Sequence, residues 1–348
     1  MSAALPAYVR HCVRHCVRRV TGGISAFPTI PAIPAMTIQR YDTTMQHSWD
    51  EFVAHSRNAT FLHFRAYMDY HSDRFHDHSL VFRNDKGGIT ALLPANAEGE
   101  TLYSHQGLTY GGLIITMKTS AREVIEAFRL LTDYAKEQGF RKIIYKPVPS
   151  HYHRYPCEED LYALFYATHS ALEARNIASV IDFRQPLTWS QNRRLGVNRA
   201  KRNGLYVKET DDFAAFWKIL EDNLRERYDA APVHSLAEIT MLKDRFPDNI
   251  RLFMAYDSCH CPQAGTVIYD TNGVAHSQYI SSTSEGKQLH AVDILFSEVV
   301  RHYASTHRYF DFGTSNEQGG TFLNETLIHQ KEGFGARAII YDAWVITL

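Results

Sequence analysis

Apolar and polar residues follow one another in the first half of the chain in an order that is typical of an α/β protein. Residues 80–83 and 89–94 are β-rich runs on either side of a glycine-containing turn, which predicts a hairpin. Apolar residues then recur at helical spacing over residues 124–134, and Gly139 stands where a helix C-cap belongs. The β-rich run 143–145 predicts a strand after that helix.

Two further signals flank this pattern. Ser48 precedes a short amphipathic segment with Glu51 at the third position, which predicts a capped helix start. Residues 158–174 begin with acidic residues and carry an apolar stripe, so we expect a second amphipathic helix there.

The second half of the chain repeats this order of elements. We expect a strand at residues 250–255, a hairpin at 265–280 and a loop at 281–286. An amphipathic helix at 289–303 and a closing strand at 309–312 follow. This internal duplication indicates an α/β (α+β) fold with mixed sheets and flanking helices, and a chain of 348 residues also favours two cores. We expect two lobes, residues 36–185 and 186–348, with a cleft between them.

Charge and cysteine content narrow the setting. The formal net charge is −1, so the surface as a whole is not expected to attract nucleic acid or anionic membranes, although a local basic patch is compatible with it. No apolar run reaches the roughly 18–20 residues that span a bilayer. Five cysteines at irregular spacing do not indicate a disulfide framework, so we expect reduced thiols and a cytoplasmic protein.

Residues 1–35 are set apart from the predicted fold. They contain arginines but no acidic residue, and Pro28, Pro31 and Pro34 interrupt regular structure. An arginine-rich, acid-free start is typical of a transit peptide. Translation from Met36 is the simpler interpretation, and it makes these residues a disordered or misassigned extension.

Three segments of the chain resemble Fem-type (FemAB/FemX-like) members of the GNAT superfamily of acyltransferases. They are an opening motif, a basic helix and a closing pattern, at residues 49–63, 192–205 and 309–336. The closing pattern is the most specific of the three. The resemblance covers about residues 37–348 and implies two tandem GNAT-like (acyl-CoA N-acyltransferase) lobes. It also implies an acceptor in the cleft and an acyl donor near the central strands of the second lobe.

The resemblance implies acyl transfer but leaves the donor open. Fem-type transferases proper use aminoacyl-tRNA to extend peptidoglycan cross-bridges, and relatives in surface-polymer pathways are called acetyltransferases. The chain lacks the long charged helical hairpin of some Fem proteins, so it resembles a shorter relative. We expect transfer from acetyl-CoA or another acyl-CoA to an amine, such as an amino sugar or a surface-polymer precursor, in cell-envelope biosynthesis.

Two alternatives stay open. The first is aminoacyl-tRNA-dependent transfer to a cell-wall precursor, against which the near-neutral charge argues. The second is a non-catalytic two-lobed protein that binds a ligand in its cleft, against which the presence of a lysine and an aspartate in the closing pattern argues.

The resemblance puts the donor loop at residues 281–290. A loop that enters a helix presents backbone N–H groups and the positive end of the helix dipole to the pyrophosphate of CoA. The residues assigned to donor binding are Ser281, Ser282, Gly286 and Lys287. The loop has fewer glycines than the family pattern, and an ordinary capped loop is the alternative.

Two residues are assigned to the chemistry. Lys331 stands at the position of a lysine that lies near the reacting carbonyl in Fem-type sites, where a fixed cation stabilises an oxyanion. A solvated surface lysine is the alternative. Asp311 ends the strand that follows the second lobe's helix, a common place for a site residue in α/β sheets, and a structural hydrogen-bonding acid is the alternative.

Eight polar residues are assigned to an acceptor that is a small molecule, a saccharide or a peptide. They follow the matching strands of the two lobes or lie in a stretch that approaches the acceptor in relatives, and simple exposure is the alternative for the lysine. The eight are Lys146, Tyr152, His153, Arg227, Tyr228, Asn316, Glu317 and Asn324. The run from Cys259 to Cys261 lacks a second ligand pair at zinc spacing, so no metal is expected.

Overall fold

The computed structural model describes residues 35–348, except for the side chains of Arg227 and Tyr228. The prediction that the N-terminal extension is disordered therefore lies outside the described residues. Within residues 35–348, no helix combines the length and apolar character needed to cross a membrane.

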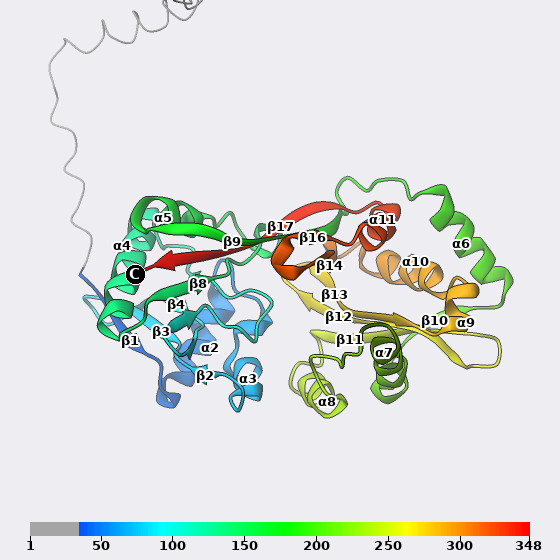
Figure 1. The fold of residues 1–348 in the computed structure, drawn as a ribbon, viewed down its shortest axis with the longest axis horizontal. Coiled ribbons are helices and arrows are strands. Elements are labelled where there is room, and N and C mark those ends of the chain that lie inside the picture. The colour runs from blue at the N-terminus through cyan, green and yellow to red at the C-terminus, as the bar shows by residue number, and fades with distance from the viewer. Residues whose placement is uncertain (1–34) are drawn as a thin grey trace, which may run out of the picture. The chain divides into compact units, whose positions relative to one another are not determined.

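Two sheets and a small strand pair organise residues 35–348 (Figure 1). The first sheet has the order β1 (Met36–Arg40), β3 (Leu80–Asn84), β4 (Ile89–Leu93) and β7 (Ile114–Ile115). The second sheet has 11 strands in the order β10 (Tyr206–Thr210), β11 (Ile250–Tyr256), β12 (Pro262–Thr271), β13 (Val274–Ser282), β14 (Tyr309–Thr314), β9 (Ser170–Asp182), β17 (Arg337–Thr347), β8 (Lys142–Tyr145), β6 (Thr101–Tyr103), β5 (Asn96–Glu98) and β2 (His76–Asp77). The small pair is β15 (Asn316–Glu317) with β16 (Phe322–Leu323).

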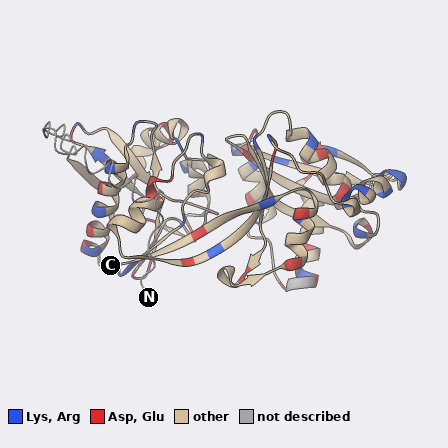
Figure 2. Ribbon diagram, turned by 90° about the horizontal axis from the view of Figure 1, so that it is seen from above, with Lys and Arg blue, Asp and Glu red and all other residues tan. Residues whose placement is uncertain are grey.

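The helices divide between the two halves of the chain. The first half contains α2 (Gln46–His55), α3 (Arg65–Met68), α4 (Ala121–Glu137), the 3-10 turn η4 (Ser150–Tyr152) and α5 (Glu159–Ala167). The second half contains α6 (Gln191–Arg202), α7 (Phe213–Tyr228), α8 (Leu236–Arg245), α9 (Ser284–Gln288), α10 (Ala291–Tyr303) and α11 (Glu325–Gly333). Acidic and basic residues are interspersed over both halves (Figure 2).

Each lobe has its own core of helix against sheet. In the first lobe the apolar face of α4, including Phe128 and Leu131, packs in one cluster with Leu102 of β6 and Ile143 of β8. The second lobe has a cluster in which α10 packs on β12 and β14, with Phe296 of α10 fully buried. The predicted hairpins, the helix over 124–134, the basic helix and the closing strand are all confirmed.

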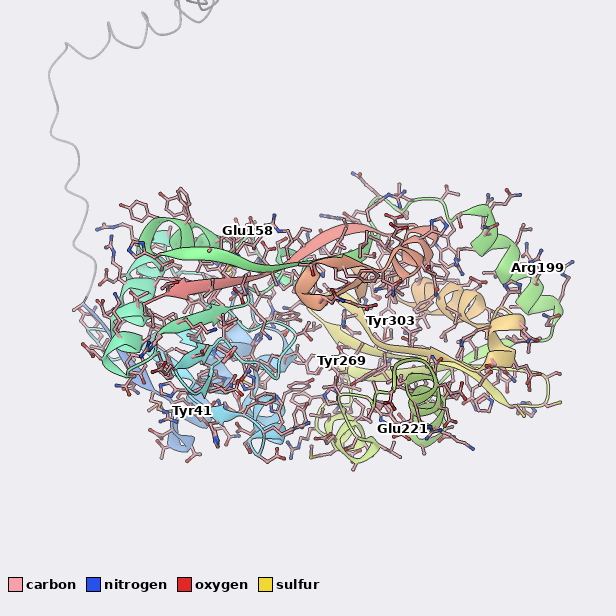
Figure 3. All side chains as sticks on the ribbon, in the orientation of Figure 1. Tyr41, Glu158, Arg199, Glu221, Tyr269 and Tyr303 are labelled. Atoms are coloured by element: carbon pink, nitrogen blue, oxygen red, sulfur yellow. The ribbon has the colours of Figure 1, made fainter. Side chains whose placement is uncertain are left out.

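The two lobes also share a core and two long strands. Tyr269 of β12 (Figure 3) packs its ring edge against Phe61 of the first lobe, 5.2 Å between centroids. β17 lies between β9 and β8 in the sheet. It pairs with β9 along most of its length and with β8 near its C-terminal end, and the C-terminal end of β9 pairs with β14. The two GNAT-like lobes are therefore joined into one continuous sheet by β9 and β17. The lobe limits at residues 185 and 186 stay a prediction, because β17 returns to the first lobe.

Three local predictions were wrong in detail. Ser48 does not cap a helix: α2 begins earlier, and the Ser48 hydroxyl donates to the Met45 carbonyl inside its first turn. The helix expected over residues 158–174 ends at Ala167, because Ser170 already begins the long strand β9. The loop expected over 281–286 contains the start of the short helix α9, which the hydroxyl of Thr283 caps by accepting from the Gly286 N–H.

Candidate active site

The central strands of the second lobe separate beyond a short parallel pairing. β14 pairs with β13 only over Val274–His276, whereas β13 continues to Ser282 and pairs with β12 along its length. Among the described residues, the edge of β13 that faces away from β12 therefore has no strand partner between Ser277 and Ser282. An unpaired edge can add an extended chain through main-chain hydrogen bonds.

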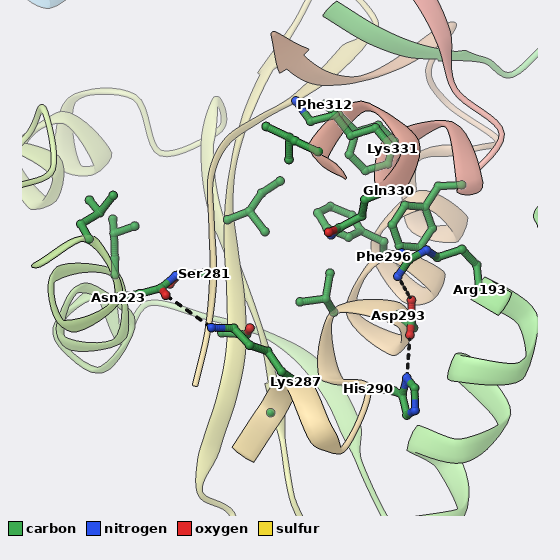
Figure 4. Close-up of a pocket in the computed structure, with 18 residues that line it drawn as sticks. Arg193, Asn223, Ser281, Lys287, His290, Asp293, Phe296, Phe312, Gln330 and Lys331 are labelled. Atoms are coloured by element: carbon green, nitrogen blue, oxygen red, sulfur yellow. Dashed lines mark hydrogen bonds and ion pairs between the residues drawn. The ribbon is translucent and has the colours of Figure 1, made fainter. Parts of the chain in front are cut away.

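A cavity of about 430 Å³ lies where these strands separate (Figure 4). β13, α9, α10, α11, α6 and α7 all contribute to its wall. The lining residues are Arg193, Leu220, Asn223, Leu224, Ile280, Ser281, Ser282, Gly286, Lys287, His290, Val292, Asp293, Phe296, Phe312, Leu327, Gln330, Lys331 and Phe334. Five of the predicted site residues, the four of the donor loop and Lys331, are thus brought together.

Lys331 is a buried cation in the wall of this cavity. Its Nζ donates to the carbonyl oxygens of Gly313, at 3.0 Å, and Thr314, at 2.7 Å. An ammonium group has three N–H donors, so one remains for a ligand. Burial lowers the pKa of Lys331 to about 8, while the charge of Asp311 opposes this shift. The group is therefore still mostly protonated at neutral pH, and the alternative of a solvated surface lysine does not hold.

The donor loop is positioned by contacts with β12 and α7. Gly286 lies so close to the Gln263 carbonyl that a Cβ at this position would be 2.2 Å from the oxygen, which explains why the loop needs glycine here. Ser281 is buried and its hydroxyl donates to the Ile219 carbonyl. The ammonium of Lys287 donates to the Asn223 side chain at 3.4 Å.

A network of charged side chains in the cavity wall was not predicted from the sequence. Asp293, in the first turn of α10, accepts from Arg193 of α6 at 2.6 Å and contacts His290 Nδ1 at 3.1 Å. α6 approaches closely because Gly196 faces Asp293, where a Cβ would be 2.1 Å from the carboxylate. The sequence signal for this contact was present in the basic helix 192–205 and in the acid of the α10 first turn, but their pairing is set by tertiary structure.

Asp311 does not line the cavity and is fully buried behind it. Its Oδ2 accepts from Tyr152 at 2.8 Å and Tyr341, and contacts His151 Nε2 at 3.2 Å and His276 Nδ1 at 3.1 Å. Burial alone would raise the pKa of Asp311, but its two histidine partners hold it well below the usual value. The ionised Asp311 carboxylate on β14 therefore links η4 of the first lobe to β13 and β17 through these contacts.

The other first-lobe residues assigned to the acceptor lie apart from the cavity. The Lys146 ammonium donates to the Leu108 carbonyl, and burial lowers its pKa to about 8. His153 is buried with Nε2 at 2.8 Å from the Val148 carbonyl, and burial lowers its pKa to about 4. Tyr152 is committed to the Asp311 carboxylate.

The second-lobe residues assigned to the acceptor are engaged in local structure. Asn316 accepts from the Ile177 N–H of β9, and Asn324 caps α11 by accepting from the Leu327 N–H. Glu317 is exposed and accepts from the Asn324 side chain at 3.2 Å. Arg227 and Tyr228 end α7, and their side chains lie outside the described part of the chain. Within residues 35–348, no group of three or more His, Cys, Asp or Glu side chains is arranged to hold a metal ion.

Part of the second lobe is similar in sequence to a known domain family. Residues 189–318 match the sequence model of the Acetyltransferase (GNAT) domain family, and this segment contains β10 to β14, α6 to α10 and the donor loop. None of the curated proteins compared with the chain matches it in sequence.

Solved structures extend the likeness to both lobes. FemX is 9% identical and superposes with a TM-score of 0.62, over 87% of this chain and 96% of that chain. A conserved protein of unknown function from Bacteroides thetaiotaomicron gives a TM-score of 0.58 at 11% identity, over 90% and 100%. The C-terminal domain of a putative lysylphosphatidylglycerol synthetase from Agrobacterium fabrum gives 0.55 at 10% identity, over 88% and 92%. The predicted resemblance to Fem-type GNAT proteins is confirmed at the level of the fold.

Proposed function

We propose that this protein is an N-acyltransferase that moves an acyl group from an acyl-CoA thioester, held between β13 and β14, to an amine. The observation that carries the proposal is the buried ammonium of Lys331 in the cavity wall, with one N–H left after it binds two main-chain carbonyls. A carbonyl in the cavity would receive that N–H, and charge that develops on its oxygen during attack would be stabilised.

The unpaired edge of β13 supports the binding of an extended donor. The pantetheine arm of CoA carries amide groups, which can bond to the free N–H and C=O groups between Ser277 and Ser282. Toward the loop, Lys287 supplies positive charge for the diphosphate, and α10 begins without a side-chain cap on its first N–H groups among the described residues. Asp293 reduces this attraction, and its ion pair with Arg193 offsets the carboxylate charge.

The acceptor that we propose is an amino sugar or another amine of a surface-polymer precursor. Lys146, Tyr152, His153, Asn316, Glu317, Asn324, Arg227 and Tyr228 stay candidates for its recognition. The first six of these already have hydrogen-bond partners within the protein, so direct contact would require those bonds to be exchanged.

Aminoacyl-tRNA is the second candidate donor, and one observation favours it. α6 borders the cavity through Arg193 and carries further exposed cations along its length, with Arg199 directed outward (Figure 3). The exposed cations are Arg194, Arg199, Lys201 and Arg202. A row of cations beside a donor cavity would bind the phosphates of an acceptor stem, and such binding weakens steeply with salt.

The two donors are separated by one assay. The full chain is incubated with acyl-CoA thioesters of different acyl length or with a set of charged tRNAs, and with amino sugars as acceptors. Thiol release that depends on acceptor amine supports the acyl-CoA proposal. Transfer only from charged tRNA, lost when Arg199 and Arg202 are both replaced by Ala, would replace it by the second candidate. Absence of transfer from both donor classes would overturn the proposed function.

A further inference from the structure

His276 occupies the point where β13 and β14 separate. It is the last residue of β13 that pairs with β14, and its partner in the register is Asp311. Beyond this pair the strands diverge toward the cavity between Ile280 and Phe312. His276 is not one of the residues that line the cavity, but it is the residue at which the opening begins, and its imidazole lies on the face of the sheet that carries Asp311.

The hydrogen bonds of Asp311 fix which nitrogen of His276 carries a lone pair. An ionised carboxylate only accepts, so whenever the His276 ring is neutral its proton is on Nδ1, 3.1 Å from Asp311 Oδ2. The lone pair is then at Nε2. Within residues 35–348 this Nε2 has no hydrogen-bond partner and is not buried, and the side chain is 13% exposed. His276 is thus a histidine oriented by a carboxylate with a free, accessible base.

The second histidine on Asp311 has the opposite arrangement. His151 contacts Asp311 through Nε2, and its remaining nitrogen, Nδ1, is buried without a partner among the described residues. Its side chain is 1% exposed. The same carboxylate therefore holds one histidine that can reach a ligand and one that cannot.

Gly313 connects His276 to Lys331. A Cβ at Gly313 would lie 3.3 Å from His276 Cε1, and the Gly313 carbonyl accepts from Lys331 Nζ at 3.0 Å. Gly313 also has a φ of +71°, a conformation that favours glycine. Gly313 of β14 thus lies next to both the imidazole and the ammonium.

We infer that His276 is the general base of the proposed acyl transfer, with Asp311 as its positioning residue. This inference rests on the proposed function. The amine nitrogen forms a bond to the acyl carbonyl carbon, and the carbon–sulfur bond of the thioester breaks with its electron pair on sulfur. The proton that the amine loses moves to His276 Nε2 and from there to the leaving thiolate or to solvent. Lys331 holds the carbonyl oxygen during these steps.

Two replacements of His276 test the role. His276→Asn retains an N–H near the position of Nδ1 for Asp311, and His276→Gln places an amide near the position of Nε2, but neither is basic. With acetyl-CoA and glucosamine, both are expected to lower kcat by about 10²–10⁴-fold, the range that general base catalysis contributes, with KM for acetyl-CoA changed much less. In His276→Ala, added imidazole is expected to restore part of kcat.

His307 supplies the matched control. It also pairs with a carboxylate, Asp270, but both of its nitrogens have partners, at 2.8 Å each, so it has no free base. His307→Gln is expected to leave kcat within about twofold of the wild type. Melting temperatures of all variants show whether the fold is retained.

Each outcome decides between the claims. If wild type turns over and His276→Gln keeps more than about a tenth of its kcat, the base is not His276, while the proposed function stands. If His276→Ala is inactive, is not restored by imidazole and melts much lower than wild type, His276 is a structural link between the lobes and the inference is wrong. If wild type releases no thiol with any acyl-CoA and amine, the proposed function fails and the inference fails with it.

Discussion

The two lobes contain the same parallel strand pair, but the chain covers the ends of the pair in the first lobe, whereas a cavity lies beyond the pair in the second. In the first lobe β6 runs parallel to β8, and the chain after β6 folds back over their ends, where the Gly111 N–H donates to the Lys146 carbonyl at 3.1 Å. Gly111 packs so tightly that a Cβ there would be 1.9 Å from the Ser104 carbonyl oxygen. In the second lobe the space beyond the β13–β14 pair holds the 430 Å³ cavity.

The helices that lie between the two strands of each pair also differ, because α4 has a side-chain cap at its start and α10 has none among the described residues. α4 of the first lobe begins with a capping box, in which Ser120 and Glu123 satisfy each other's main-chain N–H groups. The N-cap residue of α10 in the second lobe, His290, has a φ of 61° and provides no side-chain cap among the described residues. The first lobe therefore fills with its own groups the positions that are open in the second lobe. This difference supports the proposal that the donor binds in the second lobe.

Replacing Lys331 is the strongest way to test that conclusion. Lys331→Met keeps the length of the side chain but removes the ammonium, and we expect it to lower kcat by about 10²–10³-fold, the usual cost of losing one oxyanion donor. Lys331→Arg is expected to recover only part of the rate, because a planar guanidinium cannot take the position of an ammonium. Initial rates at saturating donor measure both.

The same variants test stability separately. Without the ammonium, the Gly313 and Thr314 carbonyls lose a buried donor, which costs about 1–3 kcal/mol of unfolding free energy in denaturant titrations. If Lys331→Met keeps near-full kcat, the lysine has a packing role alone, and the difference between the lobes no longer supports a catalytic site in the second lobe.

The pH dependence of the rate gives the second test. Burial lowers the pKa of Lys331 to about 8, so the cation that we propose as the oxyanion donor is present below pH 8 and is lost above it. We expect kcat to fall by about tenfold per pH unit well above that value in the wild type. In Lys331→Arg the guanidinium stays charged, so kcat of this variant, although lower than in the wild type, should not decline over the same pH range. An identical alkaline limb in both proteins would assign it to another group.

Local signals in the sequence predicted most of the elements that build the second lobe. The hairpin of β12 and β13 follows from a turn between β-rich runs, and the helical spacing over 289–303 gives α10. The strands β9 and β17 were not predicted. Their apolar residues face different environments along their length, because each strand leaves one lobe and enters the other, so no single periodicity marks them.

The candidate site was predicted in part for the same reason. Lys331 and the donor loop could be named from their motif and position, and they do line one cavity. Asp311 could be named, but not its role, because its partners His151, Tyr152 and Tyr341 come from other strands and from the other lobe. A residue whose environment is assembled from distant segments gives no local signal in the sequence.

Adding a methyl group at one glycine in each lobe compares the two strand openings directly. Gly286→Ala places a Cβ 2.2 Å from the Gln263 carbonyl and must displace the donor loop, so we expect KM for the donor to rise by about tenfold. Gly111→Ala places a Cβ 1.9 Å from Ser104 O in the filled first-lobe opening. There we expect only a loss of stability, about 1–3 kcal/mol, as for overpacking.

Kinetics and denaturant titration on the two glycine variants separate these effects. The comparison is wrong if Gly111→Ala raises donor KM as much as Gly286→Ala does. In that case the first-lobe opening also contributes to donor binding, and the filled appearance of its strand pair would not exclude a ligand.

The smallest expected effect concerns the start of α4. Ser120→Ala removes the hydroxyl that accepts from the Glu123 N–H, and loss of such a cap typically costs about 1 kcal/mol. Because α4 is closed by its own residues, this cost should appear in the free energy of unfolding alone, with kcat and both KM values unchanged. Ser235→Ala, which removes the equivalent capping box of α8 in the second lobe, is the control for the size of the capping effect. A rise in donor KM for Ser120→Ala would show that the first lobe's helix start takes part in binding after all, and that the division of labour between the lobes is not the one argued from their strands.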